Sequence, residues 1–97
     1  MKFLVKWGIQ EDKRRDVLAT FSQMTPADDQ ADQGDTLTVI GRWILPSWEG
    51  FAVVETEDPS AITGWLLNWM DAVRDVDVTP ILDDAEMREL GKKKLAG

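Results

Sequence analysis

Along this 97-residue chain, the apolar residues follow the two-residue period of a strand in some segments and the longer period of a helix in others. The order of these segments limits the folds that the chain can adopt. From Lys2 to Trp7 side chains alternate between two faces, which is typical of a strand. A helical stripe follows a candidate N-cap at Asp12 and ends near Thr25-Pro26. It consists of Val17, Leu18, Phe21 and Met24.

The second half of the chain repeats the pattern. Thr36–Leu45 and Gly50–Thr56 are rich in strand-forming residues and predict a hairpin across the intervening turn. Asp58-Pro59 predicts the start of a helix. The aspartate carboxylate can accept hydrogen bonds from the free amides of the first turn, and the N–H that proline lacks would have no partner there. The apolar stripe of that helix is Ile62, Trp65, Leu66, Trp69 and Val73. Val76–Leu82 then alternates as a fourth strand, which Pro80 confines to an edge or a strand end.

This order of elements is that of the ferredoxin-like βαββαβ fold, of the α+β class. We expect a four-stranded antiparallel sheet with two helices on one face. We expect one domain over residues 1–97, with a core of 1–84 and a C-terminal extension of 85–97 that forms a short helix or tail.

The segment 27–35 is acidic and has no apolar side chain larger than alanine. We therefore expect a mobile, solvated loop. Its aspartates do not match a calcium-binding loop, because a loop that starts at Asp28 has Gln33 where glycine is required.

Composition excludes several function classes. The chain has no His, Cys or Tyr, which removes serine and cysteine triads and His-bound zinc or haem. We predict no cofactor and no metal. With 18 acidic and 11 basic side chains the net charge is -7, so we expect no nucleic acid partner. No apolar run approaches the length of a membrane span or a signal peptide, so we expect no membrane partner and a cytoplasmic location.

The strands carry large apolar residues on both faces, as Leu4 does opposite Phe3 and Val5. A sheet face left open to water should be polar. We therefore predict a homodimer formed through the open sheet face, with a candidate small apolar ligand between the two sheets.

The hairpin holds most of the candidate pocket or ligand-contact residues. The candidates are Arg42, Trp43, Glu55, Lys6, Asp77 and Trp48. A two-residue turn at Ser47-Trp48 places Arg42 diagonal to Glu55, where the two form a cross-strand ion pair or a polar contact to a ligand; the alternative register places Trp43 beside Glu55. We prefer the first register.

The runs "MKFLVKW", "GRW", "FAVVETEDP", "GWLLNWMD" and "DVTPILDD" resemble, in order and spacing, a bacterial family of small proteins catalogued as a domain of unknown function. The resemblance covers Met1 to Asp84, and the family is similar to the dimeric α+β barrel superfamily. It implies the fold and a dimer, but no reaction. Family members often carry a His after Gly-Arg-Trp, where this chain has Ile44, and haem-handling branches of the superfamily rely on His.

Three functional hypotheses follow. The leading one is a small cytoplasmic dimer that acts as a binding or accessory protein. The alternative is a cofactor-independent monooxygenase or isomerase for a small aromatic or polyketide-like substrate, with Glu55 or Asp77 as base and Arg42 or Lys6 steadying an enolate. The third is a structural partner of another protein.

Overall fold

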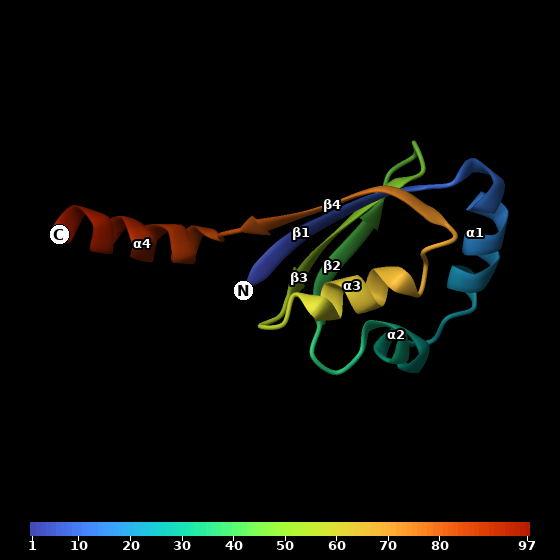
Figure 1. The fold of residues 1–97 in the computed structure, drawn as a ribbon, viewed down its shortest axis with the longest axis horizontal. Coiled ribbons are helices and arrows are strands. Elements are labelled where there is room, and N and C mark those ends of the chain that lie inside the picture. The colour runs from blue at the N-terminus through green and yellow to red at the C-terminus, as the bar shows by residue number, and fades with distance from the viewer.

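The computed structural model describes residues 1–97 as a four-stranded antiparallel sheet with helices, in the strand order β2-β3-β1-β4 (Figure 1). The strands are β1 Lys2–Ile9, β2 Thr38–Ile44, β3 Glu49–Glu55 and β4 Val73–Ile81. The helices are the 3-10 turn η1 Glu11–Lys13, α1 Arg14–Ser22, α2 Pro26–Gln33, α3 Ser60–Leu67 and α4 Asp84–Ala96. The expected α+β, ferredoxin-like arrangement is confirmed. No helix is long and apolar enough to cross a membrane.

One face of the sheet packs against helices and the other is open. In Figure 1, α1, α2 and α3 all lie to the same side of the sheet. The buried core fills this side and consists of Phe3, Val5, Leu37, Ala52, Val54, Ile62 and Trp65. Because neighbours across strands share a face, residues paired with the core positions mark the helix-covered side, and the alternate residues mark the open side.

The hairpin between β2 and β3 has the register that we did not prefer. Arg42 pairs with Ala52 and Trp43 pairs with Phe51. A bulge at residue 40 shifts the pairing of the two preceding β2 residues, Thr38 and Val39. The preference failed because Leu45 and Glu49 form the last pair of the hairpin, where the Leu45 N–H donates to the Glu49 carbonyl at 2.8 Å. This pair leaves a loop of three residues, 46–48, rather than two. Arg42 therefore lies on the helix-covered face.

The acidic segment is a helix rather than the mobile loop that we expected. Thr25 and Asp28 form a reciprocal cap at the start of α2: the Thr25 hydroxyl accepts from the Asp28 N–H at 3.2 Å, and the Thr25 N–H donates to the Asp28 carboxylate at 2.9 Å. Pro26 occupies the first helical turn. Local capping and contacts to α3 thus order a segment that buries no apolar residue of its own.

The predicted helix stripe extended too far along the chain. The helix α3 ends at Leu67, turns follow, and Val73 begins β4 opposite Ile9. The β-branched Val73 takes part in the sheet because the chain reverses in the turns after α3.

The C-terminal helix α4 projects away from the rest of the chain (Figure 1). It is longer than the short helix expected, and Asp83 and Glu86 cap it reciprocally. Its attachment to the sheet is through Lys2, whose ammonium lies 3.1 Å from Asp83 and 3.3 Å from Glu86. The radius of gyration is 15.7 Å, against about 12.5 Å for a compact chain of this length. The projecting helix accounts for that excess.

Candidate functional site

An apolar pocket of about 120 Å³ lies on the helix-covered face, between α1, the α3 region and the sheet. Its wall comprises 12 residues, of which 11 are hydrophobic. They are Trp7, Ile9, Val17, Leu18, Phe21, Arg42, Ile44, Trp48, Trp65, Leu66, Trp69 and Val73. Four of the five tryptophans of the chain thus meet at one place.

Glycine makes room for the indole at the floor of the pocket. A Cβ on Gly50 would lie 2.6 Å from the ring of Trp7, so only the absence of a side chain lets Trp7 lie against β3. Trp7 then meets Trp65 edge to face, with ring centres 6.1 Å apart and an angle of 78°.

A single carboxylate orients two of the indoles. Asp32 of α2 accepts from Trp65 Nε1 at 3.0 Å and from Trp69 Nε1 at 2.9 Å. Asn68 Nδ2 also donates to Asp32 Oδ1, at 3.0 Å. The indole N–H groups therefore point away from the pocket toward α2, and the aromatic faces are left to line it.

Arg42 is the polar member of the wall, and its charge is balanced within the protein. Its guanidinium lies 3.3 Å from Asp29 and 4.6 Å from the ring centre of Phe21. The Arg42 side chain is only 17% exposed. The predicted contact with Glu55 is wrong, because the two side chains lie on opposite faces of the sheet.

Trp48 closes the pocket at the hairpin turn. Its backbone has φ of 64°, a left-handed conformation that a tryptophan seldom adopts. Its carbonyl accepts from the Ile9 N–H at 3.0 Å, which holds the turn against the end of β1. The Arg14 guanidinium lies 5.5 Å from the centre of its ring.

The wall formed by α1 is loosely packed. No residue of α1 is buried, and Leu18 and Phe21 are 57% and 40% exposed although both line the pocket. A ligand between α1 and α3 would cover apolar surface that the chain alone leaves in water.

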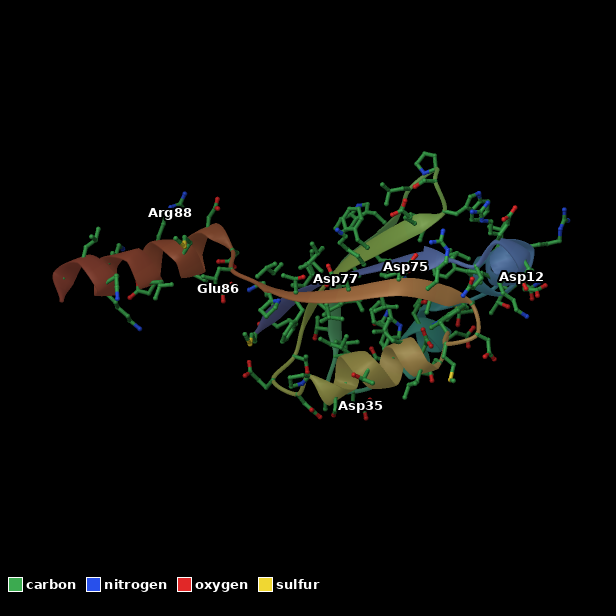
Figure 2. The ribbon with its side chains drawn as sticks, turned by 45° about the horizontal axis from the view of Figure 1, so that its top comes forward. Asp12, Asp35, Asp75, Asp77, Glu86 and Arg88 are labelled. Carbon is green, nitrogen blue, oxygen red and sulfur yellow. The ribbon has the colours of Figure 1, made fainter.

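The remaining candidates lie on the opposite, open face. Lys6 pairs with Asp77 of β4 on one side and with Phe51 of β3 on the other, and Phe51 pairs with Trp43 of β2. We call these four residues the open-face row. The rings of Trp43 and Phe51 are stacked, with centres 5.2 Å apart. Asp77 and Asp75 both lie on the edge strand β4 (Figure 2).

A wider hollow of about 430 Å³ borders this row, open to solvent. Its wall is more polar than that of the helix-side pocket and includes Lys6, Glu49, Phe51, Arg74 and Asp75. Glu55 lies outside it, at the other end of β3, opposite Lys2. The structure therefore does not bring the six candidates together: Arg42 and Trp48 line one face, and the other four lie on the reverse.

The carboxyls with displaced pKa values either cap a helix or pair with the N-terminal ammonium. The backbone N–H and then the hydroxyl of Thr25 lower the pKa of Asp28. The Glu86 N–H and then the Lys2 ammonium lower the pKa of Asp83. The N-terminal ammonium lowers that of Glu57. None of these carboxyls lines the helix-side pocket, and neither does any other. The pocket wall is therefore equipped for apolar contact rather than for proton transfer.

The helix-side pocket was not predicted from the sequence, because Trp65 and Trp69 were placed on a helix stripe that was not related to the apolar stripe of α1. The signal was available in the stripe Val17, Leu18 and Phe21, which is apolar on a helix that the rest of the chain does not bury.

The fold and the pocket together define an α+β protein with an open antiparallel sheet and an aromatic pocket beneath its helices. The chain matches the family described as "Domain of unknown function (DUF3303)" over residues 1–95, and it belongs to that family. It has no significant match among curated proteins or among solved structures.

Proposed function

We propose that this protein binds a small apolar molecule in the helix-side pocket. The observation that carries the proposal is the gathering of four tryptophans around about 120 Å³ of space with a single polar wall residue. An apolar cavity of about 150 Å³ in another protein accepts benzene, so one ring or a short branched chain suits this volume.

The loose packing of α1 supports the proposal further. Leu18 and Phe21 would gain burial when a ligand fills the space beneath them, and each buried CH₂ group contributes about 0.8 kcal/mol. Ligand binding would also fasten α1 to the sheet.

The test is titration of the ¹⁵N-labelled protein with toluene, followed through the five indole N–H signals. We expect the signals of Trp7, Trp48, Trp65 and Trp69 to shift and that of Trp43, on the open face, to stay. The variant Ile44→Trp fills the pocket and should abolish the shifts. Ile40→Trp is the matched control, because Ile40 is as exposed as Ile44, at 52% and 51%, but does not line the pocket. Shifts confined to Trp43, or unaffected by Ile44→Trp, would overturn the proposal.

We also propose that two copies of the chain pair through their open sheet faces. Trp43 is 51% exposed while stacked on Phe51, and Leu4 and Val53 lie beside them on the same face. A stable interface covers about 800 Å² on each partner, and a two-fold pairing would bury this apolar centre. The pairing would also enclose the hollow beside Lys6, which is where the ligand expected between the sheets would lie.

Sedimentation velocity tests the pairing. The unaltered chain should sediment as a dimer and Trp43→Glu as a folded monomer, with circular dichroism as the check on folding. Leu95→Glu is the control, because Leu95 is 91% exposed on the projecting helix. A monomeric unaltered chain would refute the dimer and leave the helix-side pocket unaffected.

A further inference from the structure

Arg14 is a cation without a carboxylate partner, and it lies beside Trp48, a residue of the helix-side pocket wall. It takes part in no ion pair of the chain. Its Nε is buried and donates no hydrogen bond. A buried guanidinium donor without an acceptor is uncommon, because the lost hydration is not replaced.

The position of Arg14 relates it to the pocket. Counted along α1, Arg14 precedes Val17, Leu18 and Phe21 by three, four and seven residues, so all four share one helical stripe. The same guanidinium lies over the ring of Trp48, which closes the pocket at the hairpin turn. Arg14 therefore adds a second positive charge, beside a wall in which Arg42 is the only polar residue.

The two arginines near the pocket differ in whether a carboxylate balances their charge. Arg42 already pairs with Asp29, whereas no carboxylate lies within ion-pair distance of Arg14. Glu11, Asp12 and Asp16 are its acidic neighbours in sequence, and none forms an ion pair with it. The charge of Arg42 is thus already balanced, whereas that of Arg14 is free to pair with the anionic group of a ligand.

We propose that the ligand of the helix-side pocket is a small apolar monocarboxylate, whose acid group Arg14 holds. The aromatic or branched body would lie among the indoles, and the carboxylate would accept from Nε and a terminal nitrogen of the guanidinium, the paired geometry that arginine offers carboxylates. The volume of about 120 Å³ suits a body of about one ring. This inference rests on the proposed binding function and specifies its ligand class.

Isothermal titration calorimetry at neutral pH with benzoate and with benzyl alcohol tests the proposed ligand class, because the two probes share a ring and differ in charge. We expect the full-length protein to bind benzoate at least tenfold more tightly than benzyl alcohol. Arg14→Gln should remove that preference and leave benzyl alcohol binding within twofold. Arg14→Lys, which keeps the charge but not the paired geometry, should retain part of it.

Arg15→Gln is the matched control, since it removes the same charge from the next residue of α1, outside the pocket stripe. It should leave both affinities unchanged. Equal binding of both probes would overturn the acid ligand while leaving apolar binding intact. A preference lost in Arg42→Gln but kept in Arg14→Gln would overturn the role of Arg14. Failure of both probes to bind would overturn the proposed binding function as well.

Discussion

The indole nitrogen of Trp69 donates to both carboxylate oxygens of Asp32, at 3.1 Å to Oδ1 and 2.9 Å to Oδ2. The same carboxylate accepts from the indole of Trp65, which is only 5% exposed. Asp32→Ala leaves both indole donors unpaired and should lower the free energy of unfolding by about 1–3 kcal/mol. Urea unfolding followed by tryptophan emission measures the change.

Asp35→Asn provides the control for this substitution. Asp35 follows α2 (Figure 2), is exposed and makes no side-chain hydrogen bond, so its replacement should not alter stability. Asp32→Ala should also shift the emission maximum to the red as the indoles lose their fixed orientation. Equal stability of the Asp32 and Asp35 variants would contradict the role assigned to this carboxylate.

Trp48 has an unfavourable backbone conformation, and its side chain lines the helix-side pocket. Trp48→Gly and Trp48→Ala both remove the indole, but only glycine relaxes the left-handed conformation at φ 64°. We therefore expect the glycine variant to be more stable than the alanine variant by about 1–2 kcal/mol, as thermal unfolding would measure. Both should lose pocket binding. An alanine variant as stable as the glycine variant would show that the turn does not hold this conformation in solution.

Alanine substitutions at two glycines should change the stability of the fold in opposite directions. Gly50→Ala places a methyl group 2.6 Å from the Trp7 ring and should destabilise the fold by about 1–3 kcal/mol. Gly64 is exposed within α3 with nothing within 4 Å of an added Cβ, so Gly64→Ala should stabilise by about 0.5–1 kcal/mol through helix propensity. Denaturant midpoints of the two variants provide the comparison, and midpoints displaced in the same direction would refute it.

Acid should loosen the start of α4. The Glu86 N–H and the Lys2 ammonium hold the pKa of Asp83 below its ordinary value of 3.8. Because the folded pKa is the lower one, ionised Asp83 stabilises the cap above about pH 4, and that contribution is lost as the pH falls through the folded pKa. The Glu86 amide signal, followed by NMR from neutral pH to pH 2, should move as the cap opens.

Asp83→Asn should suppress most of this transition. Asp84→Asn should preserve it, because the Asp84 carboxylate is 92% exposed and does not accept the capping bond. A transition that is unchanged in Asp83→Asn would assign the acid sensitivity to another group.

The order of strands and helices along the chain could be predicted because alternation at Lys2–Trp7 and β-branched runs later in the chain are local signals that tertiary contacts reinforce. The helix α2 was not predicted because the acidic composition of segment 27–35 was taken to indicate a loop, and the helix-capping residues before it were not considered. Thr25, Pro26 and Asp28 form a recognisable helix start, and the acidic side chains beyond it find partners on other elements. Those partners, Arg42, Trp65 and Trp69, are distant in sequence.

The face on which Arg42 lies could not be predicted, because it depends on one residue of loop length. Turn statistics favour glycine or asparagine in the left-handed position, so a three-residue loop with Trp48 there is not expected from propensity. That single residue moves the β2 side chains from Gly41 to Ile44 to the opposite face, and with them Arg42 from the open sheet to the pocket; the bulge at residue 40 reverses the effect for Thr38 and Val39. Lys6 and Asp77, which depend on β1 and β4 alone, lie together on the open face.

The central place of β1 between β3 and β4 has a consequence for biosynthesis. The first strand leaves the ribosome before either neighbour has been made, and its pairing of Lys2 with Ile81 needs most of the chain. At roughly 5–20 residues per second, translation keeps β1 waiting for seconds while the local β2–β3 hairpin can already close. The sheet is therefore completed only after β4 has been made, around a strand that was made before both of its neighbours.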